Sequence, residues 1–78
     1  MTPGPIDVVV VSLEEAEAQI AEFWVGGVLF AQTLPDGGEL VLRIEARNDG
    51  RPWDVSFREL RRALHEAAEL LALQARST

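Results

Sequence analysis

The sequence predicts an α+β domain in the order β-α-β-β-α, with a three-stranded mixed sheet and two helices packed on one face. Three observations favour this class. Residues 6–11 carry β-branched side chains at five of six positions, which is typical of a strand covered on both faces. Residues 39–47 alternate apolar and polar side chains, as a half-buried strand does. Two other segments combine a helix-capping signal with apolar residues at helical spacing.

The first helix is predicted to begin at Ser12 and to end before the glycines at 26–27. Ser12 and Glu15 have the spacing of a capping box, in which two side chains bind the free N–H groups of the first turn. Glycine at 26–27 favours the end of a helix. The stripe that this helix would turn toward the core consists of Leu13, Ala16, Ile20, Phe23 and Trp24.

Residues 28–34 and 39–47 are predicted to be the second and third strands, joined as a hairpin. Pro35, Asp36 and the glycines at 37–38 favour a tight turn between them, because Pro presets φ and Gly adopts positive φ. One face of the third strand is expected to carry Leu40, Leu42, Ile44 and Ala46.

The last helix is predicted over residues 56–75. Ser56 and Glu59 form a second capping box, and Val55 and Leu60 have the spacing of a hydrophobic staple. The apolar stripe expected to face the core consists of Phe57, Leu60, Leu64, Ala67 and Leu71.

These elements predict a sheet with one open face. The first helix is long enough to bring the first two strands parallel through a right-handed crossover. The third strand offers only one apolar face, so both helices are expected on that face. The opposite face would then expose apolar side chains of the first two strands, and a second copy of the chain is the simplest cover. The sequence therefore predicts a homodimer formed through the open sheet face.

A single domain is expected over residues 6–75, with a flexible leader at 1–5 and a flexible tail at 76–78, because 78 residues are too few for two cores. The chain has no cysteine, which excludes disulfides, thiolate ligands and thiol catalysis. The sequence has neither the pattern of a signal peptide nor an apolar run of membrane-spanning length, so a cytoplasmic location without membrane contact is expected.

The residues that carry catalytic or metal chemistry in other proteins are sparse here. His65 is the only histidine, and with Glu69 it offers two ligands, whereas zinc sites use three or four. Ser12 and Ser56 are better explained as helix caps than as nucleophiles, since no base is placed beside them. The sequence therefore predicts a protein without enzymatic activity, cofactor or metal.

Charge is distributed unevenly along the chain. The net charge is −6, and no basic residue occurs before Arg43. An acidic chain is a poor non-specific binder of phosphate backbones, so nucleic acid is an unlikely partner class by composition. The second half nevertheless carries arginines and one tryptophan that suit a partner surface, through bidentate hydrogen bonds and aromatic packing. The partner-binding candidates are Arg43, Arg47, Arg51, Trp53, Arg58 and Arg62.

The function predicted from these features is that of a small protein-interaction module, with a second copy and another protein as partners. Its size and acidity suit an adaptor, a regulator, or a neutralising partner of the antitoxin or immunity type. The alternative is a protein that binds nucleic acid or another anionic ligand through the arginines of the third strand, the 48–54 loop and the last helix. For this arginine set, which also includes Arg61, the competing explanation is pairing with the chain's own acidic half or with that of a second copy. For Trp53 the competing explanation is packing over the core at the entrance to the last helix.

Overall fold

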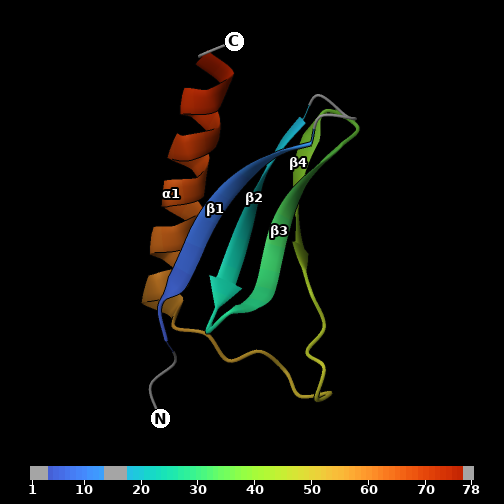
Figure 1. The fold of residues 1–78 in the computed structure, drawn as a ribbon, viewed down its shortest axis with the longest axis vertical. Helices are drawn as coiled ribbons and strands as arrows, with labels where there is room; N and C mark the ends of the chain where they lie inside the picture. The colour runs from blue at the N-terminus through green and yellow to red at the C-terminus, as the bar shows by residue number, and fades with distance from the viewer. Residues whose placement is uncertain (1–3, 14–17, 77–78) are drawn as a thin grey trace.

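The chain forms a four-stranded antiparallel sheet with one helix packed beside it (Figure 1). The computed structural model describes residues 4–13 and 18–76. In chain order the elements are β1 (Ile6–Leu13), β2 (Ala18–Val25), β3 (Val28–Asp36), β4 (Glu39–Ile44) and α1 (Phe57–Arg76). The strands lie in the sheet in the same order as in the sequence, so each strand pairs with its neighbours along the chain.

The prediction of a first helix was wrong. Residues 18–25 form β2, and β1 pairs with it antiparallel, with Val8 opposite Phe23 and Val10 opposite Ala21. The apolar residues of this segment recur at a spacing that fits a helix, but they also alternate, and pairing with the β-branched run of β1 decides between the two. Ser12 lies in β1 and caps no helix, while Glu15 falls outside the described residues.

The mixed three-stranded sheet with two helices on one face was therefore also wrong. No parallel pair of strands occurs within the described ranges, because β1 and β2 pair directly with each other in antiparallel orientation. The α+β class itself stands, with one helix in place of two.

The predicted hairpin is confirmed with a shorter turn, because Pro35 and Asp36, expected in the turn, belong to β3. β3 and β4 pair antiparallel from Asp36–Glu39 to Ala31–Ile44. Gly37 and Gly38 form the turn with φ of 60° and 83°, values that two consecutive glycines adopt without strain and that suit a two-residue hairpin. β4 ends at Ile44, three residues short of the predicted strand, and residues 45–56 then lead to α1.

The last helix is confirmed, and so is its cap. Ser56 Oγ accepts a hydrogen bond from the backbone N–H of Glu59 at 3.2 Å, which supplies a partner for one free N–H group of the first turn. The predicted apolar stripe is confirmed only in part: Ala67 is buried and Leu60 and Leu71 pack against the core, but the other two residues are exposed. Phe57 is 81% exposed and Leu64 is 40% exposed, whereas Ala63 and Ala67 are buried. Small side chains at the contact let the helix approach the sheet closely, so the alanines occupy the position expected for the larger residues.

The core lies between α1 and the face of the sheet that α1 covers. Ile6, Phe23 and Phe30 are its large buried side chains, and Ala31 lies among them. The register of β2 and β3 shifts between Phe23 and Trp24, which leaves one extra residue in β3. Such a bulge lets neighbouring residues share one face, and Phe30 and Ala31 are accordingly both buried.

The helix covers only half of the sheet. α1 packs against β1 and β2, and β4 lies on the side of the sheet farthest from it (Figure 1). Residues 45–56 pass along one end of the sheet to connect β4 with the start of α1 (Figure 1). Each residue of β4 is exposed, including Leu40, Leu42 and Ile44 on the face that α1 does not reach.

Candidate interaction surface

β4 presents apolar side chains on the face that α1 leaves open. Leu42 in β4 lies opposite Thr33 and Ile44 lies opposite Ala31, and both of these β3 residues are buried on the core face. Side chains of opposed residues point to the same face of a sheet, so Leu40, Leu42 and Ile44 extend the core face beyond the helix. They are 37% to 57% exposed. In other proteins, contiguous exposed apolar patches are typical of interaction sites, so this row is the candidate surface.

A groove of about 200 Å³ runs between this row and α1. Its helix wall is Leu64, Ala67, Ala68 and Leu71, and its sheet wall includes Phe23, Thr33, Leu40 and Leu42. The hydroxyl of Thr33 already accepts a hydrogen bond from the backbone N–H of Ala21 at 2.9 Å, so the groove offers contact area more than polar recognition. Pockets for small ligands are larger, roughly 300–1,000 Å³. The shape therefore favours side chains of another polypeptide as the occupant.

At the opposite edge of the sheet, the first turns of α1 bind the first residue of β1. The backbone N–H of Ile6, at the start of β1, donates to Glu59 Oε1 at 3.1 Å, and its carbonyl accepts from Arg62 Nη2. Arg62 also binds Glu59, and its Nη1 lies 2.6 Å from Glu66 Oε1. These side chains occupy the place that a further strand would take at this end of β1.

We call Ile6, Glu59 and Arg62 the clamp. Its hydrogen bonds shift the pKa values of Glu59 and Arg62. The hydrogen bond from Arg62 holds the pKa of Glu59 below its ordinary value, and the N–H of Ile6 adds to the effect. The pKa of Arg62 is raised, first through its hydrogen bond with Glu59 and then through that with Glu66. The capping box is therefore only half formed: Ser56 binds the N–H of Glu59, while the Glu59 carboxylate is bonded to β1 and Arg62.

Trp53 closes one end of the core. Its ring meets Phe30 edge-on, with centroids 5.2 Å apart and an angle of 73°, and its Nε1 donates to the carbonyl of Glu45 at 2.8 Å. The guanidinium of Arg47 lies 5.1 Å from the centre of the same ring. Trp53 is half-buried in this arrangement, so its packing and its N–H are already used within the chain.

Asp49 holds Arg47 in that position. The carboxylate accepts from Arg47 Nε at 3.1 Å and from Nη2 at 2.9 Å, and also from the backbone N–H of Arg51 at 3.0 Å. The N–H of Arg51 is the main cause of a lowered pKa for Asp49, and Arg47 contributes to it. A hollow of about 350 Å³ beside Trp53 includes both Arg47 and Asp49 in its lining. Since these two charges bind each other, the hollow has little attraction left for a charged ligand.

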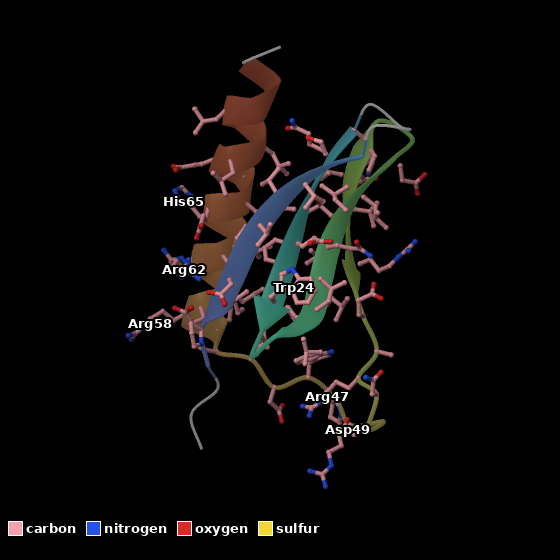
Figure 2. The ribbon with its side chains drawn as sticks, viewed as in Figure 1. Trp24, Arg47, Asp49, Arg58, Arg62 and His65 are labelled. Atoms are coloured by element: carbon pink, nitrogen blue, oxygen red, sulfur yellow. The ribbon has the colours of Figure 1, made fainter. Side chains whose placement is uncertain are left out.

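The structure separates the predicted partner-binding residues into three places. Arg43 lies on β4, facing away from the core side, and Arg47, Arg51 and Trp53 lie in the 45–56 connection. Arg58 and Arg62 lie on α1, at the opposite side of the molecule from Arg47 (Figure 2).

Within the described part of the chain, the ion pairs of the arginines join residues that are close in the sequence, and not the basic second half with the acidic first half. Arg47 and Arg62 bind Asp49, Glu59 and Glu66, which are acids within four residues of them, and among the described residues neither arginine forms an ion pair with the acidic first half. Arg58, Arg61, Arg62 and His65 surround a shallow hollow on α1, but the acids bound to Arg62 lie beside it. Over the described residues the arginines form no continuous basic surface, so this arrangement gives no support to a nucleic-acid interface.

No feature of the described residues points to an enzyme. His65 Nε2 lies 2.9 Å from Glu69 Oε1 on the exposed side of α1, and no group of three or more His, Cys, Asp or Glu side chains in the described ranges is placed to hold a metal ion. No helix in the described part of the chain is long and apolar enough to cross a membrane.

Sequence reasoning missed the groove and the clamp. The alternation in residues 39–47 indicated that Leu40 and Leu42 face the core. The open surface was not predicted, because two helices were expected to cover the core side, and one helix is too narrow to cover four strands. No local pattern indicated that Glu59 and Arg62 bind Ile6, which is more than fifty residues away.

The chain matches no protein-family model, and neither a curated protein nor a solved structure shows significant similarity to it. The class of this protein is therefore defined by its own fold and surface. It is a four-stranded antiparallel meander with one C-terminal helix and an open apolar half-face.

Proposed function

We propose that this protein is a small protein-interaction module that associates with a second copy of itself. The observation that carries the proposal is the half-covered core face, where Leu40, Leu42 and Ile44 continue the core beyond the reach of α1. A chain of 78 residues buries only about 60–65% of its unfolded surface on folding, a smaller share than larger domains bury. Burial of these residues against another chain stabilises the fold as well as the complex.

The roles that suit such a module are those of an adaptor, a regulator or a neutralising partner. The net charge of −6 favours a basic protein as a further partner. The apolar groove beside α1 supplies contact area for that partner's side chains. No described residue cluster requires a chemical step, and binding alone accounts for the surface.

The solution mass, measured by light scattering over a dilution series, tests self-association. We expect a dimer that dissociates on dilution, and we expect Leu40→Glu to shift that dissociation to a concentration at least about tenfold higher. Leu40 is 56% exposed, so a charge at this position costs the single chain little.

Leu73→Glu is the matched control. Leu73 is 59% exposed on α1 and does not line the groove, so this variant should dissociate as the unmodified chain does. A monomer at every concentration would refute self-association. Equal weakening by Leu40→Glu and Leu73→Glu would show that the open half-face is not the surface involved.

A further inference from the structure

β4 carries a row of backbone groups that no described strand pairs. The N–H of Glu45 donates to the carbonyl of Phe30 at 2.8 Å, next to the last β3–β4 pair. Hydrogen bonding alternates along an antiparallel ladder. Every second residue, namely Leu40, Leu42 and Ile44, therefore directs its N–H and C=O away from β3 to the open edge. Pro35 fits this assignment, because it lies opposite Leu40, where no N–H is needed.

The backbone groups at the two edges of the sheet have different surroundings. At the β1 edge, Glu59 and Arg62 bind both backbone groups of Ile6. At the β4 edge, neither Glu39 nor Arg43 forms an ion pair or a side-chain hydrogen bond with any residue that the structure describes. Exposed strand edges pair with other strands unless they are blocked. At the β1 edge only Ile6 is engaged in this way, whereas at the β4 edge the outward backbone groups of Leu40, Leu42 and Ile44 face no described strand.

We propose that β4 pairs antiparallel with β4 of a second copy, about a two-fold axis through Val41, so that two four-stranded sheets become one of eight strands. The inference rests on the proposed self-association and names the surface and register through which it occurs. Leu40 then lies opposite Leu42 of the second copy and exchanges backbone hydrogen bonds with it. Glu39 lies opposite Arg43 of the second copy, and the symmetry repeats both pairs.

Charge selects this register from the alternatives. Opposed residues of an antiparallel pair share a face and a hydrogen-bonding direction, so the two-fold axis must pass through a residue of β4. An axis through Glu39 or Arg43 opposes like charges. An axis through Leu42 puts Glu39 opposite Glu45, and an axis through Leu40 puts Glu39 opposite Val41. An axis through Ile44 puts Arg43 opposite Glu45, but it aligns Glu39 with Asp49, beyond the end of β4. The axis through Val41 alone gives each copy's Glu39 an opposite charge within β4 without opposing like charges, and it does so at a close, non-hydrogen-bonded pair.

The pairing also completes the open half-face. A two-fold axis perpendicular to the sheet keeps α1 of both copies on one side. Leu40 and Leu42 of the two copies then form one apolar strip between the two helices. The groove beside α1 opens onto this strip in each copy, so the two copies build a single site together.

Cysteine cross-linking tests the register directly, because the chain has no cysteine of its own. With the axis through Val41, oxidised Val41→Cys should form a covalent dimer, since the two Cα atoms would lie about 4.5 Å apart. Leu40→Cys and Leu42→Cys should remain uncoupled, because each would be offset from its own copy by two residues, which exceeds the reach of a disulfide. Circular dichroism of each variant checks that the fold is kept.

Each other outcome overturns the register. If only Leu40→Cys or only Leu42→Cys cross-linked, the two-fold axis would pass through that residue and not through Val41. A dimeric mass with no cross-link at all three positions would place self-association on another surface and leave the proposed function standing. A monomeric mass of the unmodified chain would instead remove the proposed function itself.

A charge exchange supplies an independent measurement. Glu39→Arg and Arg43→Glu should each raise the dissociation constant of the dimer by about tenfold, because each change creates two like-charge pairs. The double variant should restore the constant to within about threefold. Arg61→Glu, an exposed change of the same size on α1, is the control and should have no effect. A double variant as weak as either single one would exclude the pairing of Glu39 with Arg43.

Discussion

At the scale of single residues, the Ile6, Glu59 and Arg62 clamp does more than fasten two elements. Both backbone groups of Ile6 would otherwise face solvent at the edge of the sheet, and the side chains of α1 supply their partners. Glu59 also receives the hydrogen bond of Arg62, so the three residues act as one network. Groups connected in this way respond together to a change in any one of them.

The clamp predicts acid sensitivity. The pKa of Glu59 is lower in the folded chain than its ordinary value of 4.5, so the unfolded chain binds more protons in acid. The stabilisation is fully present above that value and is lost as the pH falls below it. Glu59→Gln should therefore narrow the difference in urea midpoint between about pH 6 and about pH 3.

The control for this prediction is Glu69→Gln, which removes a carboxylate from the same helix where it binds only an exposed histidine. Its midpoints should differ between the two pH values as much as those of the unmodified chain. Asp49, whose pKa is also lowered, contributes acid sensitivity to the unmodified chain and to both variants. In Glu59→Gln the difference in urea midpoint between the two pH values should therefore narrow without vanishing. An unchanged difference in Glu59→Gln would show that the clamp does not stabilise the fold.

At the scale of elements, the last helix was predictable in position but only partly in rotation, since Leu60, Ala67 and Leu71 of the predicted stripe pack on the core. The Ser56 cap and the apolar spacing are local, and both are found in the structure. Which residues of a broad apolar stripe touch the sheet depends on how closely the two elements approach. Ala63 and Ala67 meet the sheet because they are small, and Phe57 is consequently turned to solvent.

This rotation predicts opposite results for two substitutions on α1. Ala67→Asp should destabilise the fold by about 3 kcal/mol or more, because the residue is 3% exposed and the charge would be buried without a partner. Phe57→Asp should change stability by no more than about 0.5 kcal/mol, since the position is exposed and an acid in the first turn favours the helix. Urea unfolding followed by circular dichroism measures both. A larger loss for Phe57→Asp would indicate that the helix packs as the sequence first predicted.

The segment that became β2 could not be assigned from local sequence. Its apolar residues satisfy helical and strand periodicity together, and a capping signal at Ser12 favoured the helix. The deciding interaction is the pairing of residues such as Val8 and Phe23, which joins two segments and is invisible to a pattern within one of them. The hairpin of β3 and β4 was predictable, by contrast, because its turn residues and its alternation agree.

At the scale of the whole molecule, the candidate surface depends on the count of helices. With two helices the core side of the sheet would be covered, and the opposite face was the expected place for a partner. With one helix the core side itself remains open over β4. The arginines and Trp53 were recognisable from the sequence as candidates, but local acids and the core engage Arg47, Arg62 and Trp53 within the chain.

Self-association predicts that thermal stability depends on concentration. If dimer formation and folding are linked, a tenfold increase in protein concentration should raise Tm by about 4 °C. Leu40→Glu should show a smaller shift, because it weakens the association that provides the linkage. Scanning calorimetry at three concentrations measures this effect. A Tm that is independent of concentration would indicate that the single chain carries all the stability.

The clamp at Ile6 also orders events during synthesis of the chain. β1 leaves the ribosome early, but the side chains that protect its edge belong to residues made more than fifty positions later. Until the first turns of α1 emerge, the β-branched run of β1 stays open to pairing with other nascent chains. Misassembly is therefore most favoured in the interval between translation of the sheet and translation of the helix. The interval ends when Glu59 and Arg62 of the helix bind the backbone groups of Ile6.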